Sequence, residues 1–367
     1  MQATLPTKAP FKWIHSPAWD LAWFQSALWI FPVFFGLFYL VGEPEFKFYS
    51  AIVFILFRLM HTYFSAYLCL GHPDYSQVSK ELSFRFYLIP IIITGGITLF
   101  FILPHALFPL TIVERFNLYT LIVFPLTYWH YALQHYGVIS IYRSKARQSL
   151  TPFHYNLEKW FCHVTTTFLV TILTLKNFYD VSFGGFSLRE FLSIPLVDWN
   201  LITFCLVIPL VLLLTYHELK NLVPSIPKLL YIWSIAFMSL VVTSQNLLVS
   251  WMLLDMQHFL VVFGLGGHML SRGHTGKPGK SLLSISAVLI LVSVILSFVY
   301  FYFNAHGLTH KNYGLVLGHF VSPGQSETLN LFFYGFFIAT GICHYYYDRL
   351  AFRFSDKKIG PIVKNLI

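Results

Sequence analysis

Charged residues are scarce in this chain. Asp, Glu, Lys and Arg make up only 11% of its 367 residues, whereas 56% are hydrophobic and the mean hydropathy is +0.65. A soluble domain of this length could not bury so much apolar surface, so the composition excludes an ordinary soluble protein and favours an integral membrane protein. The net charge of +9 is then explained by membrane topology, and we predict no nucleic-acid partner.

Cysteine is also rare. The four cysteines lie in or beside apolar stretches, and no two of them form a Cys-x-x-Cys pair. This pattern excludes a disulfide framework and a thiolate metal site. Residues 1–20 lack the pattern of a cleaved signal peptide, so we expect the first hydrophobic span to direct insertion into the membrane.

What the chain has instead is long hydrophobic stretches. They predict an all-α, polytopic membrane protein with about ten transmembrane helices, organised as a single transmembrane domain over residues 1–367. The expected spans are residues 21–41, 50–71, 86–103, 117–142, 156–176, 199–219, 228–246, 248–271, 282–303 and 327–348. With ten spans, most Lys and Arg residues fall on the side that holds both termini, which predicts cytoplasmic termini in a bacterial cytoplasmic membrane.

Histidine is the most informative residue type. Among the 16 histidines, some recur in expected spans two, four, eight and ten, and we select one candidate from each span, namely His61, His130, His258 and His344. These four spans all run in the same direction, and the histidines lie between the midplane and the cytoplasmic side. Lipid offers an imidazole no polar partner, so such side chains should converge on one interior site, and we predict that they bind a metal.

Carboxylates stand at helical spacing from two of these histidines. Asp348 follows His344 at i+4, and Asp255 precedes His258 at i−3. A metal-bound histidine usually passes its second ring N–H to such a group, which fixes the tautomer. We therefore predict that Asp348 and Asp255 orient the histidine ligands.

The stretch 128–142 has the densest polar pattern inside an apolar run. Gln134 follows His130 at i+4 and is predicted to orient it, with His135 beside them. Tyr131 and Tyr136 on this stretch, together with Tyr345, are candidates to donate a hydrogen bond to bound oxygen.

All-imidazole ligation without thiolates suits iron, copper, zinc or nickel and argues against magnesium or calcium. We predict a single ferrous, non-haem iron. A haem held by two facing histidines and a dinuclear site extended by His135, His163 and His217 are the alternatives. The aromatic content of 19%, with 39 Phe, indicates a cavity for a bulky apolar ligand.

With these residues in view, the chain resembles the Brp/Blh membrane family of carotene-cleaving dioxygenases. Its segment His344-Tyr-Tyr-Tyr-Asp-Arg-Leu-Ala-Phe-Arg353 is similar to the terminal H-x-x-x-D-x-x-x-F-R stretch of that family. His130-x-x-x-Gln134 is similar to an H-x-x-x-D motif with an amide in place of the acid. The chain departs from the family at Ser65, where an aspartate is expected after His61, and near His258, where a second histidine is missing.

The resemblance implies a helical membrane enzyme with non-haem iron at its centre. The predicted function is accordingly a membrane-embedded iron oxygenase or oxidoreductase, with O2 and a lipid-soluble molecule such as a carotenoid or other polyene as its substrates. A histidine-ligated haem protein for electron transfer or sensing and a metal-free transporter are the alternative functions. The sequence does not determine an oligomeric state.

Overall fold

The computed structural model describes residues 12–104, 106–169, 171, 182–183, 186–187, 199–221, 223–244, 247–272, 288, 291–292, 295 and 327–367. Within these residues the chain is helical, apart from one antiparallel pairing of β1 (Ser182–Phe183) with β2 (Phe186–Ser187). The helical class predicted from the sequence is therefore confirmed. Apart from a few isolated positions, the predicted span at 282–303 lies outside the described residues.

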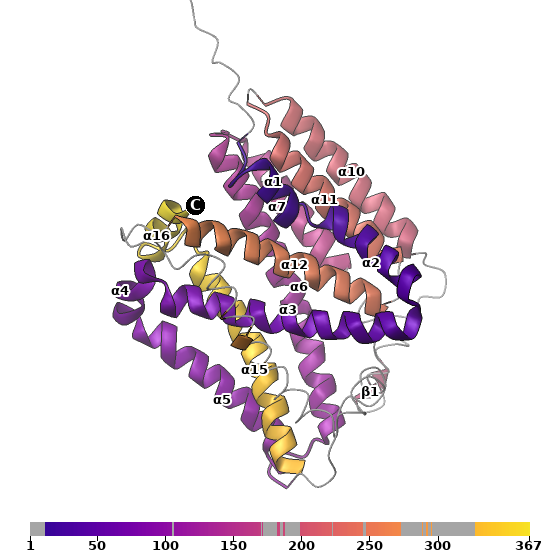
Figure 1. Ribbon diagram of the computed structural model, residues 1–367, viewed down its shortest axis with the longest axis vertical. Helices are drawn as coiled ribbons and strands as arrows, with labels where there is room; N and C mark the ends of the chain where they lie inside the picture. Colours follow the sequence, from indigo (N-terminus) through magenta and orange to yellow (C-terminus); the bar gives the residue numbers. More distant parts are fainter. Residues whose placement is uncertain are drawn as a thin grey trace, which may run out of the picture. The chain divides into compact units, whose positions relative to one another are not determined.

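The described parts of the other predicted spans fall on one helix or on two consecutive helices (Figure 1), whereas residues 172–176 and 245–246 of two of these spans lie outside the described residues. The α-helices are α1 (Pro17–Trp23), α2 (Ala27–Val41), α3 (Glu43–Gly71), α4 (Pro73–Glu81), α5 (Ile89–Ile102), α6 (Ile112–Lys145), α7 (Pro152–Cys162), α10 (Trp199–Leu219), α11 (Ile226–Ser244), α12 (Leu247–Ser271), α15 (Glu327–Ala351) and α16 (Ile359–Leu366). Two π-helical turns, η1 (Phe84–Leu88) and η2 (His163–Phe168), continue directly into or out of α-helices.

Fewer helices than ten meet the requirements for crossing a membrane. Among the described residues, three segments are long and apolar enough, Phe84–Ile102, Asn200–Leu219 and Leu253–Leu270, and α1 with α2 makes a fourth if this pair, bent by 55°, is one span. Helices α6 and α15 are long, but His130, Gln134, His344 and other polar residues lower their hydropathy. The residues that suggest a function thus make their own helices less apolar.

The three apolar segments differ in burial. Leu253–Leu270 of α12 is 94% buried, whereas Phe84–Ile102 and Asn200–Leu219 are each 22% buried. A helix that is apolar all round and buried belongs to the interior, whereas one that is apolar all round and exposed is typical of a lipid-facing position. α12 is therefore an interior helix, and α5 and α10 present apolar outer surfaces.

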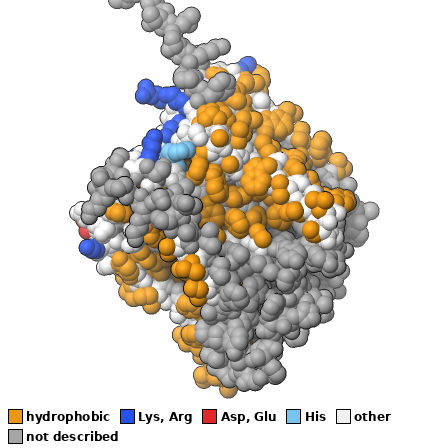
Figure 2. Space-filling model, viewed as in Figure 1, with side chains coloured by type: hydrophobic (Ala, Val, Ile, Leu, Met, Phe, Trp, Pro, Cys, Tyr) orange, Lys and Arg blue, Asp and Glu red, His pale blue; other side chains and the backbone are white. Residues whose placement is uncertain are grey.

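The chain divides into two compact units, and the single transmembrane domain expected from the sequence remains a prediction. Unit 1 comprises Met1–Phe34 and Asn117–Gly264, and unit 2 comprises Phe35–Phe116 and Leu265–Ile367. In unit 1, α10 packs along α11 and against α7 (Figure 1). Figure 2 shows hydrophobic side chains gathered over the region of α10 and α11. The exposed apolar residues of α10 include Leu201, Phe204 and Leu212.

In unit 2, α15 packs along α5 and also against α3, while α16 contacts α4 (Figure 1). Gly335 permits the close approach of α15 to α5, because a Cβ there would lie 3.1 Å from Thr98 Cα and 3.2 Å from Phe101 Cβ. Gly266 does the same for α12 and α3, since its Cβ would overlap the ring of Phe64. Small residues at helix contacts are the usual means of tight packing in membranes.

Helix ends are satisfied by local side chains. Ser16 and Thr151 accept hydrogen bonds from Trp19 N and His154 N at the starts of α1 and α7, each followed by a proline at the first helical position. At the other end of α5, the buried guanidinium of Arg115 donates to the carbonyls of Phe100, Phe101 and Leu103 and to two carbonyls of the following loop. Arg115 therefore supplies donors for carbonyls that the helix leaves without intrahelical partners.

Candidate metal centre

Two of the predicted histidines meet in unit 2. His61 of α3 and His344 of α15 are both buried, and their ring centroids lie 4.6 Å apart with an interplanar angle of 75°. The two helices pack directly against each other. The pairing therefore joins residues that are 283 positions apart in the sequence and lie on neighbouring helices.

A carboxylate completes this cluster. Asp348, one turn after His344, places Oδ2 at 3.9 Å from Nε2 of His61. Its Oδ1 accepts a hydrogen bond from the hydroxyl of Ser65, which is one turn after His61 on α3. One ligand atom each from His61, His344 and Asp348 lies within 4.8 Å of the others.

The chemistry of this donor set fits a first-row transition metal. Two neutral imidazoles and one carboxylate are the ligands of non-haem ferrous sites, in which further coordination positions stay open for oxygen and substrate. Ser65 holds one carboxylate oxygen, which orients the other towards His61. A ligating carboxylate that is itself hydrogen-bonded is typical of metal sites.

A cavity of about 430 Å³ adjoins the cluster, and His344 lies in its wall. The cavity is lined by residues of α3, η1, α5 and α15, all within unit 2. Tyr345 contacts His344, and the centroids of the two rings lie 4.2 Å apart. The cluster thus combines potential metal ligands with space for a small molecule.

The other two predicted ligands meet in unit 1. His130 of α6 and His258 of α12 have ring centroids 5.2 Å apart. The ring of Tyr131 stacks on His258 at 3.8 Å and 24°, and its hydroxyl donates to Oδ1 of Asp255 over 2.5 Å. Tyr131 therefore connects Asp255 to His258 by stacking and a hydrogen bond.

The remaining predicted residues of α6 contact other groups of unit 1. Gln134 donates from Nε2 to the backbone carbonyl of His258 over 3.4 Å. His135 is buried and bonded through Nδ1 to the hydroxyl of Tyr231 at 2.7 Å. The ring of Tyr136 lies 5.7 Å from that of Tyr155. The metal-site roles assigned to these residues remain predictions.

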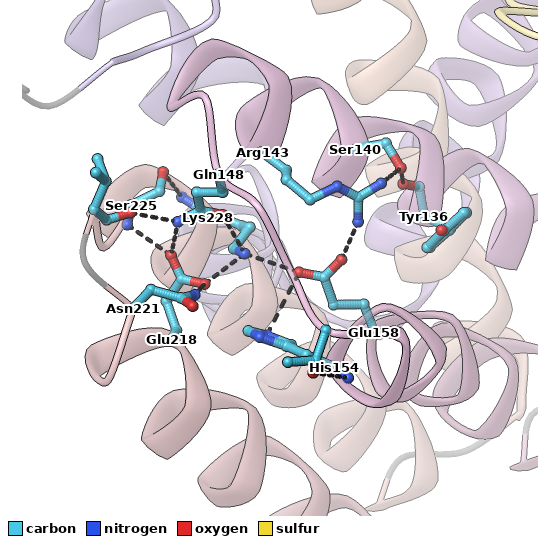
Figure 3. A network of polar contacts seen from close by, with 12 residues as sticks. Tyr136, Ser140, Arg143, Gln148, His154, Glu158, Glu218, Asn221, Ser225 and Lys228 are labelled. Atoms are coloured by element: carbon cyan, nitrogen blue, oxygen red, sulfur yellow. Dashed lines mark hydrogen bonds and ion pairs between the residues drawn. The ribbon is translucent and has the colours of Figure 1, made fainter.

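A second buried polar cluster lies in unit 1 (Figure 3) and was not predicted from the sequence. Lys228 of α11 reaches Glu158 Oε1 of α7 at 2.8 Å and Glu218 Oε2 of α10 at 2.5 Å. Arg143 of α6 pairs with the second oxygen of Glu158, and Gln148 accepts from Lys228 Nζ at 2.7 Å. We call these residues, together with His154, the Glu–Lys network.

The Glu–Lys network contains a group of potential metal ligands, since atoms of His154, Glu158 and Glu218 lie within 4.8 Å of one another. However, the ammonium group of Lys228 contacts both carboxylates, where it already supplies the positive charge that a metal ion would bring. Burial, reinforced by Lys228, lowers the pKa of His154 to about 4, so its imidazole is neutral at pH 7. The Glu–Lys network therefore fits a structural brace, that is, a set of buried ion pairs that connects four helices and balances its own charge, better than a metal site.

A weak signal for this network existed in the sequence. Glu158, Glu218 and Lys228 are charged residues at the borders of apolar stretches, which favours mutual pairing. The hydrogen bond between Ser65 and Asp348 had no comparable signal, because only the tertiary packing of α3 on α15 brings them together.

Comparison of the chain with protein-family models, with curated proteins and with solved structures finds no match.

Proposed function

We propose that the protein is a membrane-embedded, metal-dependent oxidoreductase, specifically a non-haem iron oxygenase that acts on a lipid-soluble substrate such as a carotenoid or other polyene. The observation that carries this proposal is the convergence of His61, His344 and Asp348 within 4.8 Å beside a cavity that His344 lines. Buried imidazole and carboxylate groups at membrane depth are costly and are characteristic of functional sites.

The membrane setting is part of the proposal. Three apolar helical segments support it, and only 22% of two of them is buried. The proposed topology is the ten-span arrangement with cytoplasmic termini, because it concentrates Lys and Arg on one side.

The proposal gives each residue of the cluster a separate task. His61 and His344 present neutral imidazoles from two packed helices, and Asp348 supplies one negative charge that offsets part of the charge of a divalent ion. Ser65 donates to Asp348 and thereby fixes the carboxylate. A bound ferrous ion would supply the activation of O2 for attack on a double bond or a C–H bond. The similarity of the segment 344–353 to the terminal stretch of the Brp/Blh family agrees with this assignment.

The test is metal analysis of detergent-purified protein together with its visible spectrum. We expect about one iron per chain and no Soret band, as for a mononuclear non-haem site. His61→Ala and His344→Ala should lose the iron, whereas His15→Ala, which changes an exposed histidine of unit 1, should retain it. His130→Ala and His258→Ala test independently whether the pair in unit 1 contributes to metal binding.

A Soret band would show bound haem, and the protein would then be a haem protein and not a non-haem iron oxygenase. Full iron occupancy in both His61→Ala and His344→Ala would remove these residues from the site. Absence of metal after reconstitution with ferrous iron would overturn the proposal altogether.

A further inference from the structure

Thr62 and Thr94, in the wall of the cavity beside His344, are hydrogen-bonded within the protein. The hydroxyl of Thr62 donates to the carbonyl of Arg58 over 2.9 Å, and Thr94 is bonded to Cys343 at 3.1 Å. Each hydroxyl is committed to a partner on its own or a neighbouring helix. These side chains therefore present mainly carbon to the cavity.

Two tyrosines of the inner wall, Tyr63 and Tyr347, are also hydrogen-bonded within the protein. The hydroxyl of Tyr347 donates to the carbonyl of Phe86 over 3.0 Å, and Tyr63 is hydrogen-bonded to Thr340. A hydrogen-bond acceptor of a ligand would have to take one of these donated protons from a backbone carbonyl, which leaves that buried carbonyl unsatisfied at a cost of about 1–3 kcal/mol. The wall therefore selects for a ligand that is hydrocarbon where it contacts the protein.

The opposite side of the cavity is open at α5 and η1. Tyr87 is 42% exposed and Ile91 is 65% exposed, yet both also line the cavity. The segment that carries them, Phe84–Ile102, is one of the three segments apolar enough to cross a membrane. The mouth therefore lies on a surface whose chemistry matches lipid chains.

We propose that this cavity is a binding pocket for the hydrocarbon part of a membrane-dissolved molecule, which enters sideways from the lipid past Tyr87, Ile91 and Gly95 and reaches His344. The inference rests on the proposed function for the membrane setting and specifies the substrate of the same site as an uncharged, hydrocarbon-like chain. The cavity volume of about 430 Å³ is in the range of small-molecule pockets, which is roughly 300–1,000 Å³.

Two adjacent glycines of α5 provide a matched pair of variants. Gly95 lines the cavity and Gly96 does not, both are exposed, and a Cβ at either position would meet no atom of the described residues within 4 Å. Gly95→Phe therefore places a ring at the mouth, whereas Gly96→Phe places the same ring beside it. Each variant replaces one glycine of α5 by phenylalanine, so the change in helix propensity is the same in both and cancels in the comparison.

The experiment uses the full chain in phosphatidylcholine nanodiscs and an uncharged aryl diazirine that dissolves in the bilayer. After irradiation, mass spectrometry locates the labelled residues. We expect labelling at Ala66 and Cys343 in the inner wall, a reduction of about ten-fold in Gly95→Phe and no reduction in Gly96→Phe, since a bulky side chain excludes a ligand by overlap. Labelling of the exposed residue Ile92 should be equal in all three proteins and reports that each is inserted.

Equal labelling of the inner wall in both variants would overturn the proposal that this cavity binds a hydrocarbon ligand. The proposal would also fail if Ile92 were labelled in the wild type and the inner wall were not. Because the label needs no metal, this result is separable from failure of the proposed function. Loss of iron with intact, Gly95-sensitive labelling would refute the oxygenase and leave the pocket standing.

Discussion

In unit 1 the carboxylates Glu158 and Glu218 share the ammonium group of Lys228, whereas in unit 2 the carboxylate of Asp348 lies between the imidazole of His61 and the hydroxyl of Ser65. Both regions are buried, and both bring carboxylate and histidine atoms within 4.8 Å. Proximity of ligand types is therefore insufficient to define a metal site. The charge at the centre of the cluster and the space beside it decide between a brace and a binding site.

The largest effect is expected when the positive charge of the Glu–Lys network is removed. Lys228→Met leaves Glu158 and Glu218 buried around an uncharged side chain, which should lower the free energy of unfolding by about 3–5 kcal/mol. Thermal unfolding of the detergent-purified protein measures this loss. Lys220→Met is the control, because Lys220 is an exposed lysine that contacts Tyr216 at the surface.

Adding Glu218→Gln to Lys228→Met should restore part of the lost stability, because the charge of Glu218 disappears while Glu158 keeps its ion pair with Arg143. If Lys228→Met unfolds at the same temperature as the wild type, the network is not held by its central cation. The comparison between the two clusters would then fail.

Asp348→Asn tests the other side of the comparison. The amide keeps the size of the side chain but removes its charge, so iron binding should be lost while the protein remains folded. Ser65→Ala removes only the hydrogen bond to Asp348 and should weaken iron affinity by about ten-fold. Titration of the purified protein with ferrous iron measures both changes.

Glu218→Gln is the matched control for this titration, since it alters a carboxylate of the Glu–Lys network in unit 1. It should leave iron affinity unchanged. If iron were lost from Glu218→Gln and kept by Asp348→Asn, the roles of the two clusters would be reversed.

The Glu–Lys network should also respond to acid. Burial lowers the pKa of His154 to about 4 in the folded protein, against about 6.5 in the unfolded chain. The unfolded state therefore binds a proton first as the pH falls, so the stability from neutral His154 is complete above about pH 6.5 and is lost as the pH falls towards 4.

We expect His154→Gln to reduce the loss of stability between pH 6.5 and pH 4.5 by on the order of 1 kcal/mol, after allowance for solvent screening. Unfolding temperatures of the wild type and the variant across this range provide the measurement. Parallel pH profiles for the two proteins would show that His154 takes no part in acid sensitivity.

Some of this architecture could be predicted from the sequence, because it depends on local pattern. Apolar runs of helical length predicted the helical class, and most of the predicted spans fall on helices. The structure pairs His61 with His344 and His130 with His258, residues that the sequence had grouped by their depth in the expected spans.

The contacts that determine the sites depend on packing and could not be predicted. Asp348 was assigned to His344 by its i+4 spacing, but its carboxylate also faces His61 and Ser65 on another helix. The sequence treats Lys228 only as one of the many Lys and Arg residues that set the topology, whereas it is buried between residues of two other helices. Helical periodicity gives the face of a side chain and contains no information about which helix will cover that face.

The smallest effect is expected at the ion pair between Glu81 of α4 and Lys358, which immediately precedes α16 in unit 2. Lys358 Nζ lies 2.7 Å from Glu81 Oε2, and a hydrogen bond from this lysine lowers the pKa of Glu81. The stability from this pair is therefore present above the usual carboxylate pKa and is lost as the pH falls through the lowered value.

The two side chains are 41% and 51% exposed, however, so water and salt screen their attraction. Lys358→Ala should leave the unfolding temperature unchanged within error at physiological salt. A destabilisation as large as that of Lys228→Met would mean that burial does not set the strength of these pairs. The contrast tests the physical basis of the comparison, because the two lysines form similar bonds to glutamate and differ mainly in their access to water.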